Sequence, residues 1–238
     1  MTRERKIVQL QVRLARIAAR HAPAALACSL GADDMVLLDV ARRHAPAIEV
    51  FVLDTGRLHE ETYRLLERIR ARYGFQPRVL LPEPAALERF VGEHGVNPFY
   101  RSVELRRACC ELRKVAPLAR ALAGKAAWIT GQRRQQSPTR AGLAPQQFDS
   151  RHGILKFNPL ADWTDGDVWA YLRRFDVPYN ELHDRGYPSI GCSPCTRPVT
   201  AGEDPRAGRW WWEQPETKEC GLHTGPRDAH AQGAPAHV

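Results

Sequence analysis

Residues 24–44 read AALACSLGADDMVLLDVARRH, and this stretch decides the fold. Its opening, AALACSL, is a short apolar run that ends just before Gly31, a pattern typical of a buried strand. From Asp33 to His44 the apolar residues recur at helical spacing. The stretch therefore predicts a strand, a tight turn and a helix.

The alternation of strand and helix patterns continues on both sides of this stretch. Further strands are expected at 48–54, 78–81 and 126–130. Helices are expected at 3–21, 33–44, 58–74, 85–94 and 104–123, and another is expected to begin at Thr164. Strands that alternate with helices predict an α/β fold, with a mostly parallel sheet covered by helices on both faces.

Two regions lack this alternation. Residues 131–149, GQRRQQSPTRAGLAPQQFD, are polar and contain glycine and proline, so we expect a long irregular loop, a type that is commonly functional. The last fifteen residues are expected to form a disordered tail. Cys28 lies inside an apolar run and is expected in the core, and packing is also the default role for the tryptophans at 210–212.

Composition limits the classes of function. With 238 residues the chain can bury one good-sized core. The net charge of +8 suits an anionic partner, and because no long basic block is present, a basic pocket is favoured over a nucleic-acid surface. No apolar stretch is long enough to span a bilayer, and the first residues contain no signal-peptide core. The protein is therefore expected to be soluble and cytoplasmic.

The turn SLGADD at 29–34 is a candidate anion site. A turn between a strand and a helix exposes backbone N–H groups at the helix N-terminus, where an anion can bind. Ser29 adds a hydroxyl donor, and Gly31 allows a ligand to approach the backbone closely. The alternative is an ordinary turn in which Asp33 caps the helix.

A second candidate site, DTG, follows the next predicted strand and contains Asp54, Thr55 and Gly56. Open α/β sheets bind ligands at the carboxyl ends of their strands, and these residues lie at that edge. The alternative is again a helix cap, supplied by Asp54 or Thr55.

Four of the six cysteines form two tight pairs, Cys109–Cys110 in CCELRK and Cys192–Cys195 in CSPC. Thiolates in such pairs bind iron–sulfur clusters or zinc, and adjacent cysteines are unusual in structural zinc sites. A [4Fe–4S] cluster is therefore favoured over zinc and over unligated core cysteines. Lys114 follows Cys110 by four residues and on a helix would share its face; the alternative is a solvated surface lysine.

Arginines gather in the non-helical segments near these cysteines. Guanidinium groups bind sulfate and phosphate oxygens with paired donors, although charge runs more often form solvated faces. The candidates are Arg133, Arg134, Arg140, Arg206 and Arg209.

A series of motifs, in this order over about 30–223, resembles the assimilatory adenylyl-sulfate (APS) reductases, within the wider family that also reduces 3′-phosphoadenylyl sulfate (PAPS). The motifs are SLGADDMVLLD, DTGRLHEETY, RRACCELRKVAPL, WITGQRRQQSPTR, KFNPLADWTDGDVWAYL, GYPSIGCSPC, GRWWWE and KECGLH. The resemblance implies an adenine-nucleotide α-hydrolase-like fold of the PP-loop type, a [4Fe–4S] cluster and a cysteine nucleophile.

The resemblance also implies roles for individual residues. Cys220 in KECGLH matches the nucleophile, Lys114 the lysine coupled to cluster and substrate, and Arg206 and Arg209 the arginines that face the sulfate and phosphate. The four paired cysteines match the cluster ligands. The turn at 29–34, with Ser29, Gly31, Asp33 and Asp34, would bind the nucleotide, 54–56 would lie near the adenosine, and the 133–140 loop would cover the anion.

These roles imply a domain division and a reaction. Residues 1–200 would form the nucleotide- and cluster-binding domain, 201–223 a catalytic segment and 224–238 the tail. The Cys220 thiolate would attack the sulfur of APS, and an outside dithiol, thioredoxin or glutaredoxin, would then release sulfite. His223 would orient the thiolate or donate a proton, unless it is a solvated histidine. A homo-oligomer without nucleic-acid or membrane partners is expected.

Three other functions compete with this interpretation. A PAPS reductase, or an enzyme that accepts both substrates, is the nearest, although enzymes restricted to PAPS generally lack the two cysteine pairs. A zinc-binding nucleic-acid module would use the positive charge and the four cysteines but leaves Cys220 without a role. An ATP-dependent tRNA-thiolating enzyme would have a turn resembling SGGKDS, whose lysine is missing from SLGADD.

Overall fold

The computed structural model describes residues 2–137, 140–214 and 218. Its described strands form one sheet in the order β3-β2-β1-β4-β6-β5. All neighbours are parallel except β5 and β6. The strands are β1 (Ala24–Ala27), β2 (Glu49–Leu53), β3 (Arg78–Leu80), β4 (Ala127–Ile129), β5 (Gln146–Asp149) and β6 (Ile154–Phe157). The predicted mostly parallel sheet is confirmed.

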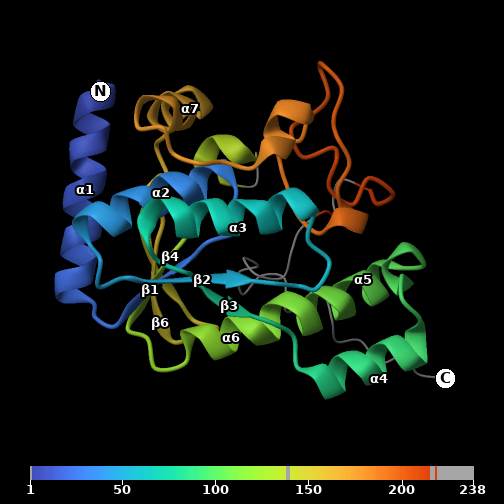
Figure 1. Ribbon diagram of the computed structural model, residues 1–238. Coiled ribbons are helices and arrows are strands. Elements are labelled where there is room, and N and C mark those ends of the chain that lie inside the picture. Colours follow the sequence, from blue (N-terminus) through green and yellow to red (C-terminus); the bar gives the residue numbers. More distant parts are fainter. Residues whose placement is uncertain (1, 138–139, 215–217, 219–238) are drawn as a thin grey trace.

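Helices cover both faces of this sheet, as the sequence predicts. Figure 1 shows α2, α3 and α7 on one side and α4, α5 and α6 on the other, with α1 packed beside α2. The helices are α1 (Arg3–Arg20), α2 (Ala32–His44), α3 (Glu60–Tyr73), α4 (Pro84–His94), α5 (Val103–Cys110), α6 (Ala116–Leu122) and α7 (Asp165–Arg174).

Local sequence explains where these helices begin. Thr164 caps α7 as predicted, and its hydroxyl and the Asp167 side chain form a reciprocal capping box. The alternatives in which Asp33, Asp54 or Thr55 caps a helix are wrong, because Gly31 and His59 stand at the cap positions of α2 and α3. The side chains of Asp33, Asp54 and Thr55 are therefore not used as helix caps.

The predicted helix at 104–123 is interrupted by a π-helical turn at Glu111–Val115. Pro117 has no N–H, so it cannot donate to the carbonyl of Arg113 as an α-helix requires. The N–H of Ala116 instead bonds Glu111, five residues back. The interruption lies directly after Cys110, so Lys114 is in the π turn rather than in an α-helix.

The loop expected at 131–149 is partly regular. It contains a short 3₁₀ turn at Arg134–Gln136 and ends in β5, which pairs with β6 in a hairpin. The sequence reading missed β6 because ILKF is only four residues long and carries a lysine. The expected tail at 224–238 lies outside the described residues.

Buried residues join the helices on one face of the sheet. Asp39 of α2 is fully buried, and its carboxylate accepts hydrogen bonds from Tyr73 at 2.8 Å, Tyr171 at 2.7 Å and Arg43 at 3.0 Å. The nearby carboxylate and burial raise the pKa of Tyr171 well above its usual value. This network fixes α3 and α7 against α2. Cys28 is buried in the same core, as predicted.

We predict that Tyr171→Phe lowers the free energy of unfolding by about 1.5–3 kcal/mol, because it removes a hydrogen bond to a buried charged group. Tyr179→Phe is the matched control, since its hydroxyl bonds Asp184 at the surface. It should cost less than about 0.5 kcal/mol. Denaturant unfolding of both variants measures the difference, and equal losses would contradict the prediction.

Candidate active site

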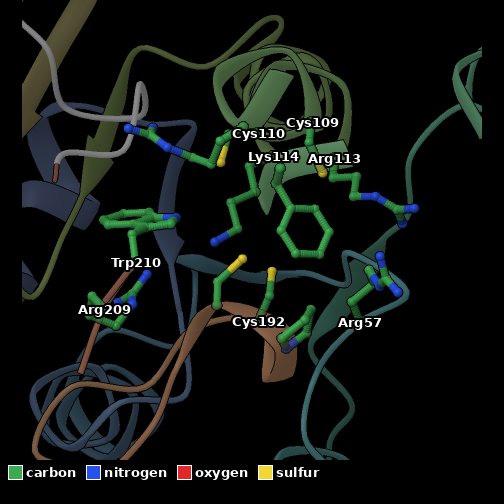
Figure 2. A pocket seen from close by; sticks show the side chains of 12 residues that line it. Arg57, Cys109, Cys110, Arg113, Lys114, Cys192, Arg209 and Trp210 are labelled. Carbon is green, nitrogen blue, oxygen red and sulfur yellow. The ribbon is translucent and has the colours of Figure 1, made fainter. Parts of the chain in front are cut away.

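The two cysteine pairs meet in one small cavity that is partly open to solvent. Cys109 and Cys110 end α5, while Cys192 and Cys195 frame a 3₁₀ turn at Ser193–Cys195. Figure 2 shows Cys109 and Cys110 across the cavity from Cys192, and Cys195 also lines it. We call this cavity the cysteine pocket; its other lining residues are Arg57, Phe99, Arg106, Arg113, Lys114, Pro194, Arg209 and Trp210.

Burial controls the chemistry of these thiols. Cys109, Cys192 and Cys195 are buried in an apolar cluster with Phe99 and Trp210. Burial raises the pKa of Cys195 to about 12, and it also raises the pKa of Cys109, against the opposing effect of Arg113. The thiolate forms therefore require a strong positive charge beside them. None of the five described cysteines forms a disulfide with another.

The turn after β2 holds both sides of the cysteine pocket. The Thr55 hydroxyl lies 3.3 Å from the Cys192 sulfur, and the Thr55 carbonyl accepts a 2.5 Å bond from Arg113. The N–H of Ser193 donates to the carbonyl of Arg57 at 2.8 Å. The predicted site at 54–56 therefore touches the cysteines directly.

Lys114 and Arg209 bring positive charge to the cysteine pocket. Figure 2 shows the amino group of Lys114 directed into the space between Cys110 and Cys192. Arg209 is buried and donates to the Ser189 hydroxyl at 3.2 Å. Its guanidinium passes Gly191, where a Cβ atom would lie 2.5 Å from Nη2. Arg206 is half-buried in the same loop and does not line the pocket.

In the SLGADD turn, Asp34 occupies the hydrogen-bond donors of Ser29. Its carboxylate accepts from the Ser29 N–H at 2.7 Å and from the Ser29 hydroxyl at 2.5 Å, and it also accepts from the N–H of Gly131. Burial is the main cause that raises the pKa of Asp34 to about 6. This carboxylate joins the ends of β1 and β4.

The 133–140 loop is cross-linked by ion pairs. Arg133 is buried and pairs with Asp33 and with Asp165 at the start of α7. Arg134 pairs with Asp162, and the Arg140 side chain donates to Gln136. The guanidinium groups of Arg133 and Arg134 thus already have carboxylate partners, and their predicted contact with a substrate anion stays a prediction.

Of the remaining predicted residues, the structure describes Asp54 and Gly56. Asp54 accepts from the Gly56 N–H at 2.8 Å and from the Tyr63 hydroxyl at 2.9 Å, and Gly56 adopts the left-handed conformation this turn needs (φ 68°). Cys220 and His223 lie outside the described residues.

The sequence reading missed Arg57, Arg106 and Arg113, which line the cysteine pocket. The spacing of Arg106, four residues before Cys110, was an available signal, because residues four apart on a helix share a face. Arg113, four residues after Cys109, carried the same signal, whereas Arg57 had none, since long-range packing places it.

The fold defines an α/β nucleotide-binding protein of the PP-loop class. Phosphoadenylyl-sulfate (PAPS) reductase from Candida auris aligns with a TM-score of 0.69 at 29% identity, over 79% of this chain and 90% of that one. FMN adenylyltransferase from Candida glabrata aligns with a TM-score of 0.56 at 16% identity, over 96% of this chain and 81% of that one, a likeness of fold alone.

Sequence comparison identifies the family. Residues 23–198 match the phosphoadenosine phosphosulfate reductase domain. The adenosine 5′-phosphosulfate reductase of Burkholderia cepacia is 54% identical over 235 residues, covering 98% of this chain and 94% of that protein. The chain belongs to the phosphoadenosine phosphosulfate reductase family, so the recognition made from the motifs is confirmed, as is the oxidoreductase class.

We predict that Gly131→Ala lowers the free energy of unfolding by about 1–3 kcal/mol, because a Cβ atom there would overlap the Asp34 carboxylate. Gly142→Ala is the control, since no atom lies within 4 Å of its Cβ position. That change should stay within about 0.5 kcal/mol. If denaturant unfolding finds both variants equal to the parent, the close packing of Asp34 against β4 is refuted.

Proposed function

We propose that the chain reduces APS to sulfite and AMP through an S-sulfonate on Cys220. The observation that carries the proposal is the cysteine pocket, in which two distant cysteine pairs meet beside Lys114 and Arg209. The adenosine 5′-phosphosulfate reductase that is 54% identical supports the substrate, and family membership supports an enzyme over a zinc-binding nucleic-acid module or a tRNA-thiolating enzyme.

The donor set of the cysteine pocket fits a [4Fe–4S] cluster, which Cys109, Cys110, Cys192 and Cys195 would hold. Thiolates of a four-iron cluster bind separate iron atoms, which suits four thiols contributed as one adjacent pair and one spaced pair. Structural zinc sites normally use pairs spaced by two to four residues. The cluster would supply a fixed charge distribution beside the sulfate group.

Substrate binding would use the carboxyl edge of the sheet. The turns at 29–34 and 54–56 would bind the nucleotide, and the 133–140 loop would cover the anion. Lys114 and Arg209, already at the cysteine pocket, would bind sulfate and phosphate oxygens together with Arg206. To bind the substrate anion, Arg133 and Arg134 would have to release the carboxylates with which they now pair.

The chemical step is a displacement at sulfur. The Cys220 thiolate forms a bond to the sulfur of APS, and the bond from sulfur to the bridging oxygen breaks. The electron pair of that bond leaves on the phosphate of AMP. Nearby cations lower the pKa of a thiol and stabilise charge on the leaving phosphate, which is the role proposed for Lys114, Arg206 and Arg209. His223 would orient the thiolate or move a proton.

A dithiol completes the cycle. One of its thiolates attacks the Cys220 sulfur and releases sulfite; its second thiol then breaks the mixed disulfide and returns Cys220 to the thiol form. The dithiol supplies both electrons, and we propose thioredoxin or glutaredoxin for this role. The cytoplasm, whose dithiols are kept reduced, is the proposed location. No helix among the described residues is long and apolar enough to cross a membrane.

The proposed division of the chain follows the chemistry. Residues 1–200 would bind nucleotide and cluster, 201–223 would carry the nucleophile, and 224–238 would be the tail. The proposed enzyme is a homo-oligomer. PAPS is the alternative substrate, and the structural similarity to the PAPS reductase from Candida auris supports testing it. Turnover measured on APS and PAPS under the same conditions decides between them.

The cluster is tested by metal content. Protein purified without oxygen should contain about four iron atoms per chain and show the visible absorption of an iron–sulfur cluster. Cys192→Ser should lose most of both. Cys28→Ala should keep both, because Cys28 lies in a separate core. Stoichiometric zinc in the parent protein would refute the cluster.

The nucleophile is tested with Cys220→Ser. Sulfite formation from APS should fall by at least about 1,000-fold, because a serine hydroxyl stays protonated where the thiol ionises. Iron content and AMP affinity should change less than about twofold, since the role proposed for Cys220 is to attack the sulfur of APS and not to bind iron or AMP. Normal turnover by this variant would remove Cys220 as the nucleophile.

A further inference from the structure

A buried ion pair joins α5 to the chain that leads to Cys220. Nε and Nη2 of Arg106 donate to the two carboxylate oxygens of Glu213, each at 2.8 Å. The side chains are only 1% and 3% exposed. Two parallel charge-assisted bonds fix both the distance and the angle between the partners. Arg106 also hydrogen-bonds Cys110, so the pair borders the cysteine pocket.

The surroundings of this pair are apolar and aromatic. Trp210 is 1% exposed, and the Arg106 guanidinium lies 4.9 Å from the centre of its ring. Trp210 in turn belongs to the cluster that contains Phe99 and Cys195. A charge in such surroundings is costly unless it is paired. Withdrawal of Glu213 would leave Arg106 buried without this carboxylate.

Backbone hydrogen bonds hold the loop that follows Cys195 before it reaches Glu213, among them one from the N–H of Val199 to the carbonyl of Gly186 at 2.8 Å. The N–H of Arg197 donates to the carbonyl of Gly208 at 3.0 Å, and the N–H of Trp210 donates to the carbonyl of Cys195 at 3.1 Å. These backbone bonds do not depend on residue type. A shift of the chain by one residue would place Trp212 or Gln214 opposite Arg106, so the ion pair fixes the register.

We propose that Arg106 and Glu213 are positioning residues: their ion pair fixes, at Glu213, the chain that leads to Cys220, so that its thiol meets the substrate's sulfur. The inference rests on the proposed function of Cys220. Buried ion pairs add little net stability, but they can select one conformation over its alternatives. The role assigned to this ion pair is to select one alignment of the chain around Glu213 with Arg106 of α5.

Chain geometry gives the size of the effect. Cys220 follows Glu213 by seven residues, a reach of at most about 25 Å. Trp212 packs against Phe99 and Tyr100, so loss of the ion pair leaves the chain attached one residue earlier but without the two directed bonds that fix its angle. Because misplacement by about 1 Å can cost a hundredfold, a loss of at least tenfold is expected.

The test changes Glu213 and leaves Arg106, which touches a cluster cysteine, in place. Glu213→Gln is mixed with APS without reductant, and the S-sulfonate on Cys220 is followed by mass spectrometry in a single turnover. Its formation should be at least about tenfold slower than in the parent. AMP affinity, iron content and the rate of Cys220 alkylation by iodoacetamide should stay within about twofold.

Glu203→Gln is the matched control. Glu203 lies in the same loop and makes the same kind of bidentate pair with Arg197, but at the surface. The control should sulfonate Cys220 at the parent rate. If Glu213→Gln loses its iron, Glu213→Asp carries the test: the shorter side chain should slow sulfonation about threefold with iron and AMP affinity unchanged.

Each other outcome overturns the inference. Parent-like sulfonation in both Glu213 variants removes the positioning role. If Glu213→Gln loses AMP affinity to the same extent as the rate of sulfonation, the ion pair has only a structural role. If the rate of Cys220 alkylation falls as much as the rate of sulfonation, the substitution acts on the reactivity of the thiol and not on its position. Failure of the parent protein to form the S-sulfonate refutes the proposed function itself, and the inference with it.

Discussion

The site depends on the turn after β2, which binds both cysteine-bearing segments at once. Arg113, three residues after Cys110, donates to the Thr55 carbonyl, while Ser193, next to Cys192, donates to the Arg57 carbonyl. Parallel strands end at one edge of the sheet, so the same turn also borders the region where nucleotides bind in this fold. The cysteine pocket and the proposed nucleotide site therefore share one short segment of backbone.

A second constraint is electrostatic. The cysteine pocket buries thiols whose pKa values burial raises, and it surrounds them with arginines and Lys114. Protein carbonyls and carboxylates hold most of these cations in place: Arg113 on Thr55, Arg106 on Glu213 and Arg57 on the carbonyl of Val96. Lys114 approaches the sulfurs from a π turn that ends just before Pro117, whose missing N–H removes one helical hydrogen bond.

Local patterns were sufficient to predict the sheet, most of the helices and the cap at Thr164, because each depends on the periodicity or the chemistry of neighbouring residues. The spacing of the cysteines likewise predicted one shared site. The β5–β6 hairpin, the π turn and the pairing of Arg133 were not predictable in this way. The hairpin and the π turn are too short to give a clear periodic pattern, and the ion pairs depend on partners distant in sequence: Arg133 meets Asp33 across 100 positions, and Arg106 meets Glu213 across 107.

The central claim is that Cys220 takes the sulfonate group directly from APS. The most direct measurement mixes reductant-free protein with APS, digests it and determines the mass of the peptide that contains Cys220. The account predicts that this peptide gains the mass of one SO₃ group, that one AMP is released per chain, and that added dithiol removes the group as sulfite. An unmodified Cys220 peptide in protein that nevertheless turns over APS would contradict it.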